Sequence, residues 1–339
     1  MDNKYVKYFI VGVKGFLMGA ADAIPGVSGG TIALVTGIYK ELIESISNID
    51  FNLFRNLKND SFPILWRKYN INFLLPLIIG IFIGFLTLIN IVSFMLENFS
   101  IQTWSFLNGL VIASGLIVLR NIKTWNILIL LFLIIGFFSV IKISSIQINH
   151  TDSSLLYLFF VGAIGICAML LPGISGALIL LILGAYKTLK NSITDLNFLN
   201  LAFFFSGALF GIISFSKIIK WFLKKKPNIS YGFLSGLILG SLNKLWPWKS
   251  TIKVLNRKTL EIIDFSKISN VGTLSVFQKI NLDSNTFEPV LEENISPQVF
   301  SAINNKEPSH LLESVIFVLV GFLFVIMLEQ VSFKLQENK

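Results

Sequence analysis

Long apolar runs, separated by short polar segments, dominate the chain. A helix needs about 20 mostly apolar residues to cross a bilayer. Such runs occupy residues 72–96, 103–119, 124–141, 199–222 and 311–331, and a shorter one occupies 230–246. Two further regions, 8–47 and 155–190, are apolar but interrupted near their centres by Pro and Gly. The pattern predicts an all-α polytopic membrane protein.

The two interrupted regions are related in sequence. Residues 24–42 read IPGVSGGTIALVTGIYKEL, and residues 171–189 read LPGISGALILLILGAYKTL. A weaker match relates LNGLVIAS at 107–114 to LSGLILGS at 234–241. We therefore expect two repeats, each a broken helical hairpin, re-entrant or fully spanning, followed by three transmembrane helices.

The repeats predict both domain organisation and topology. We expect the first repeat over 1–145, the first part of the second over 146–249, a polar insertion over 250–310 and a final helix over 311–339. Each half crosses the membrane an odd number of times whether its hairpin re-enters or spans. The second half is therefore predicted to be inverted relative to the first, as in many secondary transporters.

Composition and charge agree with a membrane protein. Hydrophobic residues make up 54% and charged residues 14% of the chain, whereas an ordinary soluble domain carries about 25% charge. The net charge of +9 comes largely from membrane-flanking loops, so the positive-inside rule explains it without nucleic acid. That rule places both termini in the cytoplasm and 250–310 outside. The single cysteine, Cys167, excludes an intramolecular disulfide, and we expect no metal or other cofactor.

The interrupted hairpins carry the most informative chemistry. A Pro-Gly pair breaks a membrane helix, and Ser28 and Ser175 then stand where a new helix begins, as favoured N-caps. A helix start leaves N–H groups unpaired and attracts anions. In hydrocarbon, such backbone persists only when it is buried or lines a cavity. Two matching breaks therefore predict a central anion site, although kinking and close packing by small residues would give the same motif.

A few ionisable residues near these regions are candidates for coupling or charge pairing. Asp22 aligns with Met169 in the second half, and an acidic residue within an apolar segment suggests function. Its roles include proton coupling, accepting backbone N–H groups, or pairing with Lys14. Basic residues at membrane boundaries attract a phosphate headgroup but also serve as snorkelling anchors. The remaining candidates of this kind are Arg120, Lys217 and the acidic Glu41.

Three stretches resemble signature sequences of the PopT-type polyprenyl-phosphate transporters, formerly domain of unknown function family 368. They read MGAADAIPGVSGGTIALVTGIYKELI (18–43), ICAMLLPGISGALILLILGAYKTL (166–189) and GLILGSLNKLWPWK (236–249). The resemblance implies a flippase of the bacterial inner membrane. It would return undecaprenyl phosphate from the outer to the cytoplasmic leaflet during cell-envelope synthesis, including that of peptidoglycan.

The same resemblance implies headgroup contacts in both loop motifs. These are Pro25, Gly26, Ser28, Gly29, Gly30 and Thr31 in the first, and Pro172, Gly173, Ser175 and Gly176 in the second. Two positions depart from the family pattern: Ala177 replaces a small polar residue, and Asn243 replaces a base. The implied partners are the polyprenyl-phosphate lipid and the bilayer. Homo-oligomerisation is left open.

Two rival functions fit parts of the sequence. Both loops match the G-x-S-G pattern of an intramembrane serine hydrolase, but a serine nucleophile needs an adjacent base. Neither His150 nor His310 lies in an apolar span, so we expect no enzyme. A secondary transporter of a small anion or ion would also use inverted repeats with helix-start sites. A lipid cargo additionally needs a side opening between helices that leads to the hairpin loops.

Overall fold

The computed structural model describes residues 3–24, 27–49, 61–146, 154–256, 259, 261–265, 287–303 and 308–337. Pro25, Gly26 and His150 lie outside these ranges. Five of the described helices are long and apolar enough to cross a membrane. They are α6 (Ile71–Asn98), α7 (Ser100–Arg120), α8 (Ile127–Ser145), α12 (Phe198–Lys225) and α16 (Leu311–Glu337). The chain is thus a mostly helical, multi-pass membrane protein, as the apolar runs predicted.

The two interrupted regions fold into the same series of three helices. The first forms α1 (Asn3–Asp22), α2 (Gly29–Val35) and α3 (Tyr39–Ser47). The second forms α9 (Leu155–Leu170), α10 (Gly176–Ile182) and α11 (Tyr186–Thr194). In each region one helix ends before the Pro-Gly motif, at Asp22 or Leu170, and the next begins after it, at Gly29 or Gly176, as predicted. The short α5 (Phe62–Lys68) precedes α6, and α13 (Pro227–Gly240) continues into the 3-10 turn η1 (Ser241–Asn243).

Small residues let the long helices approach closely. A Cβ atom added to Gly15 of α1 would collide with the Leu77 backbone of α6, and one added to Gly162 of α9 would collide with Phe204 of α12. In a bilayer, where apolar burial gives little drive for association, such close packing holds helices together. The pair α1–α6 is therefore repeated by the pair α9–α12.

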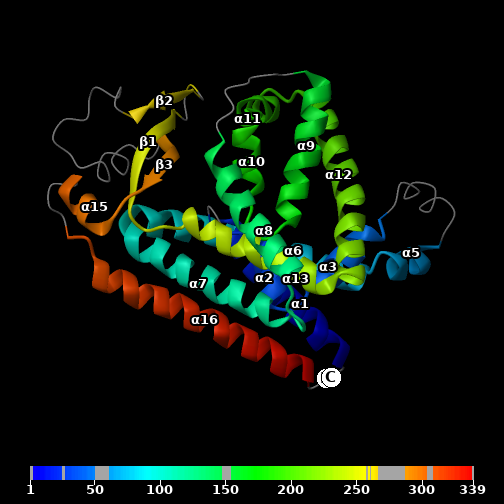
Figure 1. Ribbon diagram of the computed structural model, residues 1–339. Helices are drawn as coiled ribbons and strands as arrows, with labels where there is room; N and C mark the ends of the chain where they lie inside the picture. Colours follow the sequence, from blue (N-terminus) through cyan, green and yellow to red (C-terminus); the bar gives the residue numbers. More distant parts are fainter. Residues whose placement is uncertain are drawn as a thin grey trace. The chain divides into compact units, whose positions relative to one another are not determined.

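The last two helices of each half pack on helices of the other half: α8 packs on α13, and α7 packs on α16. Gly232, Gly236 and Gly240 of α13 press against Ile129, Leu133 and Phe137 of α8, in that order. Because both series ascend together, α13 runs parallel to α8. Along α7 and α16, Ser105 contacts Ser314, Gly109 contacts Val318, and Arg120 contacts Glu329, so these helices also run parallel (Figure 1). Each of these two helix pairs therefore contains one helix from each half of the chain.

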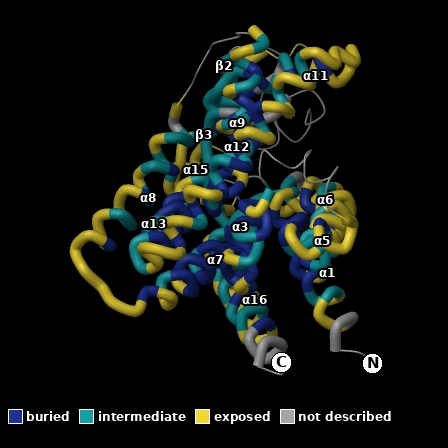
Figure 2. The backbone as a smooth tube through the Cα atoms, turned by 90° about the vertical axis from the view of Figure 1, so that its right-hand side faces the viewer, coloured by how far each residue is buried: buried dark blue, intermediate teal, exposed yellow. Residues whose placement is uncertain are grey.

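The surface of the long helices is apolar. Phe82 of α6 is 64% exposed and Ile127 of α8 is 81% exposed, and such positions are yellow along these helices in Figure 2. An exposed apolar surface of this extent is expected where lipid replaces water.

The chain separates into two compact units, Met1–Val92 with Leu110–Lys244 and Phe322–Lys339, and Ser93–Gly109 with Leu245–Gly321. In the second unit, β1 (Lys249–Asn256) pairs antiparallel with β2 (Ile262–Asp264) and β3 (Phe287–Asn294), giving the order β2-β1-β3, and α15 (Pro297–Ile303) follows. The predicted 250–310 insertion therefore contains a small sheet in an otherwise helical protein.

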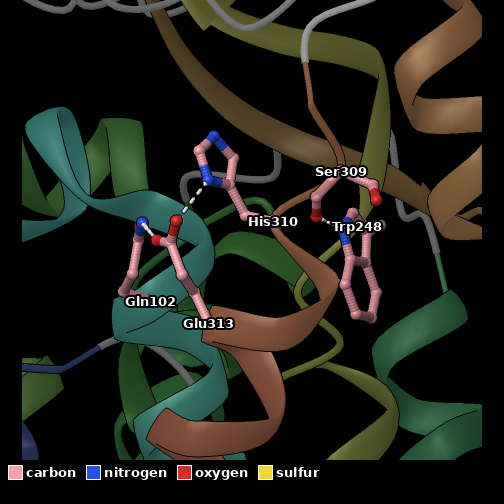
Figure 3. Close-up of polar contacts among 5 residues, drawn as sticks. All are labelled: Gln102, Trp248, Ser309, His310 and Glu313. Carbon is pink, nitrogen blue, oxygen red and sulfur yellow. Dashed lines mark hydrogen bonds and ion pairs between the residues drawn. The ribbon is translucent and has the colours of Figure 1, made fainter.

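Polar contacts tie the second unit together around the start of α16. Gln102 Nε2 donates to Glu313 at 2.5 Å, and His310 Nδ1 lies 2.9 Å from the other carboxylate oxygen (Figure 3). Trp248 Nε1 donates to the Ser309 carbonyl at 2.8 Å. These bonds link α7, α16 and the segment that enters β1.

Candidate headgroup site at the two hairpin elbows

The start of α2 is capped from within its own hairpin. Ser28 is extended, and its Oγ accepts a hydrogen bond from Gly30 N at 3.2 Å, which confirms the predicted N-cap. Asp22 Oδ1 accepts from Gly29 N at 2.7 Å, and Thr31 N donates to the Ser28 carbonyl at 2.9 Å. The prediction that these amides are free was therefore wrong for α2. Asp22, exposed at the end of α1, accepts from the Gly29 amide, one of the roles considered above, and Ser28 accepts from the other two.

The start of α10 repeats this geometry without the carboxylate. Ser175 is again the extended N-cap residue, but its side chain makes no capping bond. Within the described part of the chain, the Gly176 amide has no acceptor. A Cβ atom on Gly29 would lie 2.6 Å from Asp22 Oδ2, and one on Gly176 would collide with Met169. Met169 therefore occupies the place of Asp22, but its thioether is only a weak acceptor and receives no hydrogen bond from Gly176 N. The start of α10 thus keeps uncommitted donors.

We call the break between α1 and α2, with the start of α2, the first elbow, and the break between α9 and α10, with the start of α10, the second elbow. The second elbow packs against α13. Gly173 has φ +80°, a left-handed conformation that glycine adopts without penalty. A Cβ atom there would lie 2.6 Å from the Leu237 carbonyl oxygen. A side chain at this position would thus strain the backbone and push the elbow off α13.

The two elbows touch each other. A Cβ atom on Gly30 would lie 3.5 Å from Pro172 N and 3.6 Å from the Leu170 carbonyl oxygen. Tyr39 of α3 donates from its hydroxyl to the same Leu170 carbonyl at 2.9 Å, across the two halves. Gly30 and Pro172 are both buried. The breaks that the repeat predicted therefore meet inside the protein, which is the arrangement that a shared anion site requires.

Lys14 serves the opposite end of α2. Gly37 ends this helix at φ +74°, and its repeat counterpart Gly184 has φ +70°, the usual left-handed helix terminus. The Lys14 side chain is buried, and its Nζ donates to the Thr36 carbonyl at 2.7 Å, where Ser332 Oγ also donates at 3.0 Å. The ammonium thus stabilises the negative end of α2.

The other charged candidates are held elsewhere. Arg120 pairs with Glu329 at 3.3 Å with 67% of its side chain exposed, and Glu41 accepts from Asn70 Nδ2 at 3.3 Å. Lys217 is an exposed residue of α12. Tyr39 was not among the candidates from the sequence. Its identity with Tyr186 at the matching position of the repeat was the signal that could have identified it.

An apolar groove opens beside the second elbow. It encloses about 250 Å³ between α8, α12 and α13. The lining residues include Phe132, Leu171, Phe215, Ile219, Ser230 and Phe233. Leu171 immediately precedes Pro172, so the groove reaches the elbow itself. An opening between helices beside a hairpin loop is the feature that a lipid cargo was expected to need.

Comparison with known proteins places the chain in a family. A family model described as undecaprenyl phosphate translocase-like matches residues 18–263. The chain belongs to this family. The match includes both elbows, the helices from α6 to α13, all of β1 and the first part of β2.

Two relatives are named polyprenyl-phosphate transporters. One, from Vibrio cholerae, is 35% identical over 334 residues, covering 98% of this chain and all of that protein. Another, from Staphylococcus aureus, is 33% identical over 255 residues, covering 69% of this chain and 85% of that protein. No solved structure matches. These names describe transporters, not enzymes, and agree with the sequence-based interpretation.

Proposed function

We propose that this protein moves undecaprenyl phosphate, or a closely related polyprenyl phosphate, from the outer to the cytoplasmic leaflet of the bacterial inner membrane. This movement returns the carrier lipid for further rounds of cell-envelope synthesis. The family and the names of both relatives support the cargo. The contact between the two hairpin elbows carries the proposal, because it brings two helix starts to one buried place.

Two sets of donors hold the headgroup. The second elbow supplies uncommitted donors, and the first supplies the Gly29 amide once Asp22 releases it. A phosphate needs N–H and O–H donors, and the Ser175 hydroxyl and Gly176 amide supply them without a buried cation. At α2, the Asp22 carboxylate already occupies the Gly29 amide. A phosphate reaches this amide only when the Asp22 side chain turns away or is protonated, since two anions repel each other.

Helix directions support the inverted arrangement of the two halves. The sequence repeat equates α7 with α13, and consecutive spanning helices joined by the short 121–126 turn run in opposite directions. Thus α7 runs opposite to α8. The parallel packing of α13 on α8 makes α13 run opposite to its counterpart α7. A repeat whose equivalent helices run in opposite directions offers similar sites to the two leaflets, as alternating access requires.

The test is depletion of the protein in the bacterium that carries it, followed by measurement of polyprenyl phosphate exposed on the cell surface. The account predicts accumulation, reversed by the wild-type chain and by Ser139→Ala, a lipid-facing control on α8. Gly176→Leu should fail to reverse it at normal membrane abundance, and Ser175→Ala should reverse it in part. Unchanged surface levels upon depletion would overturn the proposed cargo or direction.

A further inference from the structure

We infer that the groove between α8, α12 and α13 binds the first isoprene units of the polyprenyl tail while the phosphate lies at the second elbow. This assignment rests on the proposed function and adds the path of the tail. It begins at Leu171, next to Pro172, and reaches exposed residues of α12 at the protein surface. The groove therefore gives one half of the transporter a binding site for hydrocarbon.

The lining admits an apolar chain and nothing polar. Aromatic and aliphatic side chains from three helices form it, and Ser230 is its polar member. The Ser230 hydroxyl donates to the Lys226 carbonyl at 3.0 Å, so it is already satisfied. Water in such a space would lack hydrogen-bond partners, and apolar cavities of this kind stay dry.

One side of the groove is open. Among its lining residues, Ile218 is 51% exposed and Phe222 is 39% exposed, both on α12. A chain several times longer than the groove can thus enter at the elbow and continue into the surrounding lipid. An enclosed pocket would have limited the cargo to a short molecule.

The position of the groove favours a polyprenyl phosphate over a phospholipid. In a polyprenyl phosphate, the phosphate is attached directly to the end of a single hydrocarbon chain. A phosphate at Ser175 and Gly176 therefore places the first isoprene units beside Leu171. A phospholipid inserts a glycerol with two ester groups at this position, and the lining offers those esters no hydrogen-bond partner.

Site-specific photo-crosslinking tests the assignment directly. The photoreactive amino acid benzoylphenylalanine replaces Phe233 inside the groove or, as a matched control, Phe205 on α12, which is 63% exposed and outside the lining. The full-length protein is reconstituted with radiolabelled undecaprenyl phosphate. We expect labelling at 233 that excess unlabelled undecaprenyl phosphate removes and phosphatidylglycerol does not. Equal labelling at both positions, or competition by phosphatidylglycerol, would show an ordinary bilayer chain in the groove and overturn the inference.

A groove-filling variant gives a second measurement. Ser230→Phe places a ring in the groove, whereas Ser206→Phe makes the same change at an exposed position of α12. The first should slow transport of undecaprenyl phosphate about tenfold, equivalent to about 1.4 kcal/mol, and the second should leave it unchanged. Normal transport by a folded Ser230→Phe protein would contradict the inference. If the wild type transports but position 233 shows no competed labelling, the groove assignment alone fails. If the wild type moves no polyprenyl phosphate, the proposed function fails.

Discussion

Replacing Gly29 with Ala tests the contact between Asp22 and the start of α2. The added Cβ atom would lie 2.6 Å from Asp22 Oδ2 and 3.1 Å from its Cγ, well inside contact distance. The carboxylate must move away, and the 2.7 Å hydrogen bond from Gly29 N is lost. By contrast, a Cβ atom on Gly30 meets its nearest neighbour at 3.4 Å, an ordinary contact, so Gly30→Ala is the matched control.

The expected cost follows from this one hydrogen bond. Leaving a buried donor unsatisfied costs about 1–3 kcal/mol, and the better helix propensity of Ala returns at most about 1 kcal/mol. Gly29→Ala should therefore destabilise the protein by about 1–2 kcal/mol, and Gly30→Ala by less than about 0.5 kcal/mol. Asp22→Ala removes the same bond. The double variant Asp22→Ala with Gly29→Ala should thus be no less stable than Asp22→Ala alone.

The assay is equilibrium unfolding in one detergent. The wild type, the single variants Asp22→Ala and Gly29→Ala and the double variant form a double-mutant cycle, and Gly30→Ala is measured beside them as the control. The account predicts a coupling of about 1–2 kcal/mol between the two positions. Strictly additive effects, or equal stability of Gly29→Ala and Gly30→Ala, would refute the claim that Asp22 holds the first elbow.

Other substitutions separate structural roles from headgroup binding. Ser28→Ala should lower stability by about 1 kcal/mol because it removes an N-cap. Ser175→Ala should leave the unfolding midpoint unchanged but weaken binding of polyprenyl phosphate, measured in detergent. If Ser175→Ala lowered stability and Ser28→Ala weakened binding instead, the proposed difference between the two elbows would be wrong. Tyr39→Phe should cost about 1–2 kcal/mol, because the bond joining the halves is lost, and a stability equal to wild type would show that this bond contributes nothing. Lys14→Met should reduce stability with little change in headgroup affinity at matched folded fraction. A large loss of affinity alone would instead make Lys14 a headgroup ligand.

The sequence predicted those features that depend on short stretches of chain. Apolar runs long enough to cross a bilayer located all five long helices, and the Pro-Gly-x-Ser-Gly motifs located both breaks and both N-caps. Asp22 was recognised as unusual because no acidic residue aligns with it.

Features that depend on packing between distant segments were beyond the sequence. The exchange of helices between halves follows from glycines that press on backbone far away in the chain, as Gly236 presses on Leu133. Acceptance of backbone N–H groups was one of several roles open to Asp22, and the motif alone does not show that its carboxylate folds back onto Gly29 N. Likewise, the role of Lys14 depends on Thr36 lying within its reach, which spacing alone does not reveal.

The most direct test of the central claim is translocation by the purified protein in liposomes containing undecaprenyl phosphate. The readout is the fraction of lipid phosphate accessible from outside, followed over time for the wild type and for Gly176→Leu at equal protein content. We expect the wild type to equilibrate the lipid between leaflets and Gly176→Leu to behave like protein-free liposomes. Equal rates for the two proteins, or no movement with the wild type, would contradict the claim that the paired elbows carry the phosphate across.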